Sequence, residues 1–169
     1  TIVDEDLLVQ FRGSAWVDLP NVPAPSSANL EYAIFADQKA DGTVGGTVTT
    51  AAWTKRTLIE VANTITGASL ASSVVTLPTG KYLVWGSAYQ ERTNGAGIRL
   101  LQGASTAHYG LPGNTATDGA NLTVFSIVNV TGSTDTLELQ YYAQSSGSTN
   151  DLGRPLPISG NTETYAMLT

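Results

Sequence analysis

Residues 74–89 have the sequence VVTLPTGKYLVWGSAY, which predicts a strand, a turn and a longer strand. Pro78 and Gly80 mark the turn, because proline presets φ at one corner and glycine tolerates positive φ at another. Beyond the turn the pleat places Tyr82, Val84, Gly86 and Ala88 on one face, and Leu83, Trp85, Ser87 and Tyr89 on the other. Large apolar groups on both faces indicate a strand that is covered on both sides.

The composition favours a β-rich, extracellular domain. Of 169 residues, 41% are hydrophobic and only 13% are charged, about half the usual share. The net charge of −6 argues against nucleic acid and anionic membranes as partners. The chain has no cysteine, which excludes disulfides and thiolate metal sites. No apolar run approaches the ~20 residues that span a bilayer, and we expect no cofactor.

Three segments are expected along the chain. Residues 1–19 predict a short neck that contains a hairpin, since two apolar pieces flank Arg12-Gly13-Ser14. Residues 20–28, PNVPAPSSA, contain three prolines and predict an extended linker. Residues 29–169 then form the main domain.

Strand signals recur at short intervals through the main domain. Asn94-Gly95 predicts a hairpin between the strands at 81–91 and 98–102. Residues 103–105 predict a second turn, which leads into a strand at 107–111. The remaining expected strands are 30–37, 53–61, 74–77, 122–130 with 136–144 as its hairpin partner, and 162–168.

The predicted fold is all-β, an antiparallel β-sandwich of the jelly-roll type. No segment keeps a period near 3.6, so almost no helix is expected. Residues 58–65, LIEVANTI, are the most helix-like, but their β-branched content favours strand or turn at least equally. Many short strands with turn signals between them are typical of a two-sheet sandwich.

An ordered set of motifs resembles the C-terminal tip domains of bacteriophage tail fibres and tailspikes. Those domains are related to the jelly roll of tumour necrosis factor and of the complement globular heads, which share the P-x-G-x-Y-x-V step found at 78–84. The resemblance covers roughly residues 24–169. Its motifs are LEYAIFADQK (30–39), WTKRTL (53–58), LPTGKYLVWGSA (77–88), a late strand pair and TYAML (164–168).

The resemblance implies a homotrimer on the virion, outside the cell, that continues from an upstream fibre shaft. The implied function is attachment to a bacterial surface receptor, a glycan or a protein. Two alternatives stay open. The domain could be a purely structural cap that closes a trimeric shaft, or an accessory domain of a polysaccharide depolymerase.

We expect no catalytic or metal site in this chain. Hydrolysis of polysaccharide needs two carboxylates across a cleft, whereas the fourteen acids are scattered and Asp4-Glu5-Asp6 is their only cluster. A calcium site that shares this cluster with another subunit stays open. His108 is the only histidine, which disfavours zinc, and no Gly-x-Ser-x-Gly elbow supports a serine triad. His108 is therefore interpreted as a loop or edge-strand residue.

The candidate receptor site is the loop at 108–121. Tyr109 offers an aromatic face for a sugar ring, and polar side chains follow it closely. The residues selected from this loop are Tyr109, Asn114, Thr115 and Asp118. Trp53 and Trp85 lie in expected strands, where packing in a core or an interface is the default.

A trimer is also predicted from the residues, because several strands are apolar on both faces. A monomer would then expose a large apolar patch, which marks an interaction surface. In the resembling family the first and last strands lie side by side on the sheet that lines a threefold axis. The residues expected at this interface are therefore Phe35, Tyr165, and Tyr141 or Tyr142.

Overall fold

The computed structural model describes residues 9–12, 15–18, 30–113, 119–132, 135–147, 149–156 and 158–169. The chain divides into two compact units, Thr1–Leu30 and Glu31–Thr169. In the first unit β1 (Val9–Arg12) pairs antiparallel with β2 (Ala15–Asp18), which is the hairpin predicted within residues 1–19. The predicted linker, residues 20–28, lies outside the described residues.

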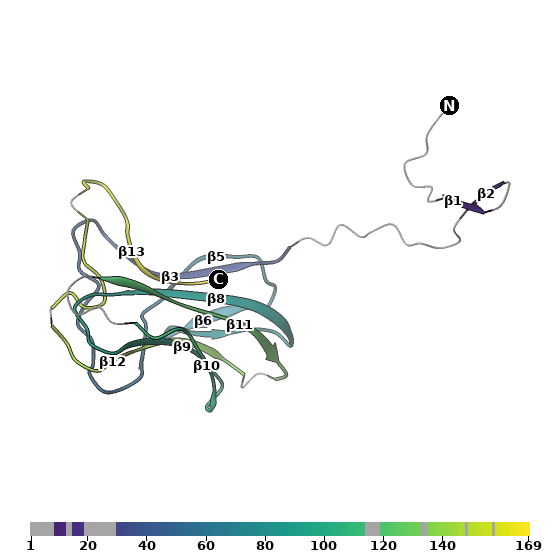
Figure 1. Ribbon diagram of the computed structural model, residues 1–169. Coiled ribbons are helices and arrows are strands. Elements are labelled where there is room, and N and C mark those ends of the chain that lie inside the picture. The colour runs from purple at the N-terminus through teal and green to yellow at the C-terminus, as the bar shows by residue number, and fades with distance from the viewer. Residues whose placement is uncertain are drawn as a thin grey trace. The chain divides into compact units, whose positions relative to one another are not determined.

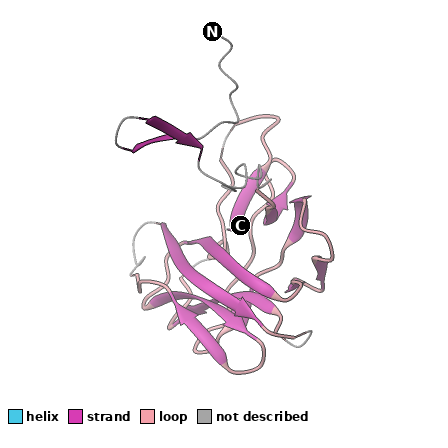
Figure 2. Ribbon diagram, turned by 90° about the vertical axis from the view of Figure 1, so that its right-hand side faces the viewer, coloured by secondary structure: helices cyan, strands magenta, loops and turns pink. Residues whose placement is uncertain are grey.

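The second unit is a sandwich of two antiparallel sheets (Figure 1). One sheet has the order β11-β8-β13-β3-β5; the other has the order β10-β9-β12-β7-β6, with β4 also paired to β12. The described residues form strands and loops only (Figure 2), and none of them builds a helix that could cross a membrane. The strands are β3 (Ala33–Lys39), β4 (Thr54–Lys55), β5 (Ile59–Asn63), β6 (Ser69–Ala71), β7 (Val74–Thr76), β8 (Gly80–Gln90), β9 (Ala96–Gln102), β10 (Thr106–Tyr109), β11 (Ala120–Val130), β12 (Leu137–Ala143) and β13 (Glu163–Leu168).

The core lies between the two sheets and follows the predicted alternation of β8. Val84 and Ala88 of β8, and Val124 of the neighbouring β11, are at most 4% exposed. Gly86 leaves room for a side chain of the opposite sheet, because a Cβ there would lie 2.8 Å from Cδ1 of Leu139. Burial of each large aliphatic side chain contributes about 1.5–3 kcal/mol, so this contact between the sheets is a main source of stability.

Two predicted hairpins are wrong because the chain changes sheets at those turns. Asn94-Gly95 separates β8 from β9, and these strands belong to different sheets. The same holds for β11 and β12, the strands found at 122–130 and 136–144. The turn chemistry itself is present, since Gly95 has a φ of 54°. A turn signal reports that the chain reverses but does not determine which sheet receives the next strand.

Other local predictions are confirmed. The turn at 103–105 joins β9 and β10 as an antiparallel pair. Residues 58–65 contain a strand, β5, and the last predicted strand is β13. β10 ends the six-stranded sheet, so His108 is an edge-strand residue.

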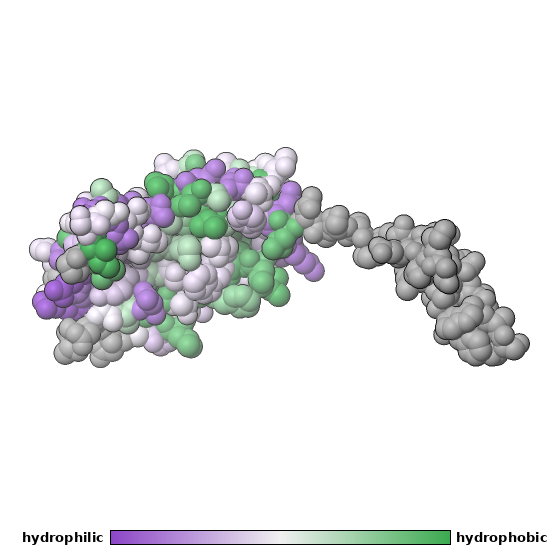
Figure 3. Space-filling model, turned by 90° about the horizontal axis from the view of Figure 1, so that it is seen from above, coloured by the Kyte–Doolittle hydropathy of each residue, from purple (hydrophilic) through white to green (hydrophobic). Residues whose placement is uncertain are grey.

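The outer face of the five-stranded sheet carries a strip of exposed apolar side chains, here called the apolar strip. It consists of Leu83 and Trp85 on β8 with Ile127 and Phe125 directly opposite on β11. Leu83, Phe125 and Ile127 are 64–67% exposed and Trp85 is 38% exposed. Strands 81–89 and 122–130 are therefore apolar on both faces, as predicted. Figure 3, which views the molecule from above, shows hydrophobic residues gathered between hydrophilic ones.

The four aromatic residues predicted at a trimer interface do not belong to this strip. Phe35 and Tyr141 are each 2% exposed and Tyr165 is 5% exposed in the single chain, so the sandwich itself encloses them. Tyr142 is half-buried on β12, in the other sheet. The interface prediction is thus corrected for Phe35, Tyr141 and Tyr165, and for Tyr142 it stays a prediction.

The physical reason for this error lies in the phase of the strands. In β3, Ala33 and Phe35 face the core, whereas Tyr32 is 48% exposed. The register of β13 against β3 shifts between Thr164 and Ala166, so that Tyr165 turns inward. Burial raises the pKa of Tyr165 to about 12. A bulge moves every following side chain to the opposite face, and alternation alone does not reveal it.

One ion pair is enclosed between the two sheets. Nη2 of Arg56 lies 3.1 Å from Oδ2 of Asp37, and the two side chains are 0% and 4% exposed. Nη2 also donates to the carbonyl of Leu152 at 3.0 Å. Burial lowers the pKa of Arg56, and the nearby charge of Asp37 opposes this lowering. Nε and Nη1 of Arg56 are buried without a hydrogen-bond partner among the described residues, so the cation depends strongly on Asp37.

We therefore expect Asp37→Asn to lower the free energy of unfolding by about 3 kcal/mol or more, because it leaves a buried guanidinium without its counter-charge. Urea unfolding measures this loss. The double variant Asp37→Asn/Arg56→Met should lose less than Asp37→Asn alone. Lys39→Met is the matched control, since it removes the more exposed partner of Asp37 and should cost about 1 kcal/mol or less. Equal losses for Asp37→Asn and Lys39→Met would contradict the expectation.

Candidate binding site on the six-stranded sheet

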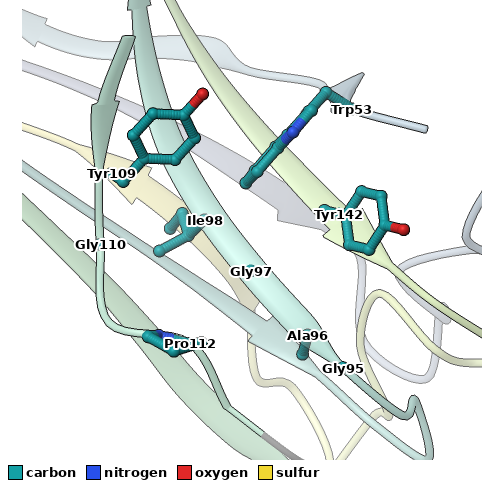
Figure 4. Close-up of a pocket in the computed structure, with 9 residues that line it drawn as sticks. All are labelled: Trp53, Gly95, Ala96, Gly97, Ile98, Tyr109, Gly110, Pro112 and Tyr142. Carbon is teal, nitrogen blue, oxygen red and sulfur yellow. The ribbon is translucent and has the colours of Figure 1, made fainter. Parts of the chain in front are cut away.

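A pocket of about 380 Å³ opens beside β9 on the six-stranded sheet (Figure 4). Three aromatic rings surround it, and they come from segments far apart in the sequence. Much of its remaining surface is backbone and small side chains. The pocket is lined by Trp53, Tyr109 and Tyr142, by residues 95–98, and by Gly110 and Pro112.

Trp53 is positioned by the short strand β4 and by a glycine on β9. β4 pairs with β12, with Lys55 opposite Gln140. A Cβ on Gly97 would lie 3.1 Å from Cη2 of Trp53, so the indole ring packs directly against the strand at that point. Arg56 follows β4, and its backbone N–H donates to the carbonyl of Leu139 at 2.8 Å. The tryptophan is thus carried by a strand that the sandwich holds firmly.

The two tyrosines flank the indole of Trp53. The ring centroids of Trp53 and Tyr109 are 5.7 Å apart with an edge-to-face angle of 63°. Those of Trp53 and Tyr142 are 5.5 Å apart at 46°. Each such ring pair contributes about 0.5–1.5 kcal/mol of stability in addition to the contribution of its buried area. Tyr109 is nevertheless 65% exposed, so its ring remains available to a ligand.

The wall opposite Trp53 is fixed by backbone hydrogen bonds. The N–H of Gly110 donates to the carbonyl of Ile98 at 2.9 Å. Ala96 and Gly113 exchange two bonds, each of 2.8 Å. A Cβ at Gly110 would overlap the carbonyl of Thr123 on the opposite sheet, which is why a glycine occupies this position. These backbone hydrogen bonds hold the wall of the pocket in place without a ligand.

One cation stands at the edge of the aromatic cluster. The guanidinium carbon of Arg99 lies 4.4 Å from the ring centroid of Trp53, within the range of a cation–π contact. Nε of Arg99 donates to Oε1 of Gln140 at 2.8 Å. Nη1 donates to the hydroxyl of Tyr109 at 3.5 Å, a long bond. Arg99 therefore combines a stacked plane with donors that remain near the pocket.

This arrangement is suited to recognition. Aromatic faces bind the apolar C–H face of a sugar ring, while hydroxyls and amides around them bind its polar groups. The residues that line the pocket include no carboxylate. Within the described ranges, no three His, Cys, Asp or Glu side chains are grouped as a metal site would require.

Of the four residues predicted for receptor binding, Tyr109 lines the pocket. Asn114, Thr115 and Asp118 fall outside the described residues. Sequence analysis assigned Trp53 to packing by default and did not select Arg99 or assign Tyr142 to binding. Nothing in their local sequence marks them, because the pairing of β4, β9 and β12 brings them together.

The other candidate residues do not meet at this pocket. Oγ of Ser126 lies 2.8 Å from Nδ1 of His108, and Nε2 of the same ring lies 3.4 Å from Oε1 of Gln102. The contact with Ser126 connects the edge strand β10 to β11 of the opposite sheet, and the contact with Gln102 connects it to β9 of its own sheet. The cluster Asp4-Glu5-Asp6 lies outside the described residues.

No family model matches the chain, and no curated protein matches its sequence. Among solved structures, murine APRIL at pH 5.0 has a similar fold, with a TM-score of 0.51, 10% identity, and coverage of 82% of this chain and 98% of the APRIL chain. Murine APRIL at pH 8.5 gives a TM-score of 0.47 at 11% identity, covering 82% and 96%. Vertex protein P5 of PRD1 gives 0.48 at 14% identity, covering 96% of this chain and 78% of P5.

At these identities the likeness concerns the fold alone. Murine APRIL at pH 5.0 has a jelly roll of the tumour necrosis factor type, and the likeness to it confirms the predicted fold class, an all-β antiparallel jelly roll.

The role of Gly97 can be tested directly. We expect Gly97→Val to displace Trp53 while the domain stays folded, since a β-branched residue suits a strand but its side chain would occupy the place of the indole. Near-ultraviolet circular dichroism should change, and the unfolding midpoint should move little. Gly132→Val is the matched control, because a Cβ there would meet no atom within 4 Å. An unchanged near-ultraviolet spectrum for Gly97→Val would show that the ring is not held there.

Proposed function

We propose that the chain is the trimeric tip of a bacteriophage tail fibre or tailspike and that it binds a saccharide on the bacterial surface. The observation that carries this proposal is the preformed pocket of Trp53, Tyr109 and Tyr142. The sequence resemblance to phage tip domains supports the setting on a virion. The jelly-roll fold supports the architecture.

Several features of the pocket favour a saccharide. Three rings offer apolar faces at different angles, which suits the alternating C–H and hydroxyl surface of a pyranose. Arg99, Gln140 and the tyrosine hydroxyls supply polar groups near these rings. Backbone bonds hold the wall at 110–113, so little ordering is needed when a ligand binds.

The proposed role is binding without turnover. Glycoside hydrolysis needs two carboxyl groups, roughly 5–10 Å apart, across the scissile bond. No such pair lines this pocket. A depolymerase activity is therefore not proposed for this pocket.

The apolar strip supports self-association. Leu83, Trp85, Phe125 and Ile127 form a continuous exposed patch on a sheet face, and such patches mark interaction surfaces. Full burial of each side chain would contribute about 1.5–3 kcal/mol. The partner that we propose for this strip is the same strip region of two further copies around a threefold axis, as the family resemblance implies.

The pocket and the apolar strip lie on opposite sheets of the sandwich. Packing of the five-stranded sheets around an axis would therefore leave three pockets facing outward. Three weak sites that engage one polysaccharide surface together can bind far more tightly than one. In this proposal the hairpin unit at 1–19 continues into the upstream shaft.

Saccharide binding should depend on Trp53. We expect a glycan array of bacterial polysaccharides to give a signal with the full chain. Titration calorimetry with the best soluble oligosaccharide should then show at least a tenfold loss of affinity, ~1.4 kcal/mol, for Trp53→Ala. Trp85→Ala is the matched control, since it removes a tryptophan of the apolar strip and should leave this monovalent affinity unchanged. A chain that binds no saccharide would instead be a structural cap.

Self-association should depend on the apolar strip. We expect the chain to sediment as a trimer at micromolar concentration and Phe125→Lys to sediment as a folded monomer, because three buried ammonium groups would lack counter-charges. Leu156→Lys is the control, as it changes an exposed apolar residue outside the strip and should leave the trimer intact. A wild-type chain that sediments as a folded monomer would overturn this part of the proposal.

A further inference from the structure

We propose that the saccharide taken by the pocket is anionic and that a carboxylate or phosphate group on it pairs with Arg99. This inference rests on the proposed function, and it specifies the chemistry of the ligand. The inference is supported by the hydrogen bonds and the lack of a counter-charge around the guanidinium of Arg99.

Arg99 has no counter-charge in the described part of the chain. Within that part, five ion pairs form, and they engage Lys39, Lys55, Arg56, Arg92 and Arg154. Among the described residues of the second unit, Glu31–Thr169, the basic residues outside these pairs are Lys81 and Arg99, and of these two Arg99 is the half-buried one that lies beside the pocket. An unpaired, partly desolvated cation in a protein of net charge −6 is an unusual arrangement that an anionic ligand would complete.

Glu138, two positions before the strand partner of Arg99 on β12, is engaged by other side chains. Glu138 accepts a hydrogen bond from Nε2 of Gln140 at 2.7 Å and lies 4.0 Å from Nζ of Lys55. The side-chain amide of Gln140 can hydrogen-bond to Glu138 and Arg99 together in one orientation only. Its amide nitrogen faces Glu138, and its amide oxygen accepts from Nε of Arg99 at 2.8 Å. The glutamine therefore separates the carboxylate of Glu138 from the guanidinium.

The remaining donors of Arg99 are available to a ligand. A guanidinium has five N–H groups, and the described contacts use one on Nε and one on Nη1. Nη2 makes no hydrogen bond within the described residues. Stacking on Trp53 and the bond to Gln140 already fix the plane of the group. A planar fork held in this way matches two oxygens of a carboxylate or a phosphate.

A single local cation suits a saccharide with one acidic group per unit better than a dense polyanion. The acids of the chain outnumber its bases by fourteen to eight, so the field around the pocket opposes nucleic acid. A sugar that stacks on Trp53 and presents one acidic substituent toward Arg99 satisfies the aromatic and the ionic feature together.

The test uses the full chain on an array that pairs acidic saccharides with their neutral counterparts. Examples are oligogalacturonate, the corresponding neutral oligogalactoside, and the same oligomer phosphorylated at O6. The wild-type chain should prefer an acidic member of a pair at least tenfold, and its affinity should fall as salt concentration rises. The carboxylate and phosphate members distinguish the two sources of negative charge.

Arg99→Gln should lose that tenfold preference for the acidic member of a pair, whereas Trp53→Ala should weaken the binding of acidic and neutral members alike. Arg99→Lys should keep the salt dependence but bind the acidic saccharide more weakly, because it retains the charge and lacks the fork. Near-ultraviolet circular dichroism checks that both Arg99 variants keep the aromatic cluster.

The outcomes separate the two proposals. Equal binding of acidic and neutral members, unaffected by Arg99→Gln, would overturn the anionic inference and leave saccharide binding standing. Tighter binding of single-stranded DNA than of any saccharide would overturn it as well. No Trp53-dependent binding to any member of the array would overturn both.

Discussion

The buried pair of Arg56 and Asp37 connects the core of this protein to its surface pocket. A guanidinium enclosed between two sheets would be very costly without the carboxylate 3.1 Å away. Arg56 directly follows β4, and Trp53 directly precedes it. The ion pair therefore anchors inside the sandwich the same two-residue strand that holds the indole outside. Loss of the Asp37 carboxylate should therefore also disturb the position of Trp53 in the pocket, because β4 connects the two.

The two sheets use their outer faces differently. On the five-stranded sheet, Trp85 and Phe125 stand opposite each other and extend an apolar strip toward solvent. On the six-stranded sheet, Gly97 removes a side chain and lets Trp53 cover the strand. Each sheet thus has one face in the shared core and a second face of distinct chemistry. The self-association and the ligand recognition that we propose would therefore not compete for the same surface.

Sequence analysis predicted the fold class and much of β8, because strict alternation and a proline-glycine turn depend on residues that are close in the sequence. It failed where the structure depends on pairing between strands that are far apart in the sequence. The bulge near Tyr165 reversed the facing of that residue, and the crossing at Asn94-Gly95 sent β9 to the other sheet. Of the candidate site, Tyr109 was recognised from its exposed context. Trp53 was not, since its neighbour Gly97 is distant in the sequence and only cross-strand pairing reveals the contact.

The same strand pairing explains how the pocket is assembled. Successive strands of a jelly roll often change sheets, so a surface on one sheet collects residues from segments far apart in the chain. Trp53, Gly97, Tyr109 and Tyr142 lie on β9, β10 and β12 or just before β4, and paired strands hold each of them. A site built in this way cannot relax one wall without breaking a ladder. This constraint matters most for the proposed role of Arg99. A guanidinium held in one orientation can distinguish a planar anionic group from a neutral hydroxyl, whereas a mobile guanidinium would contribute little more than its charge.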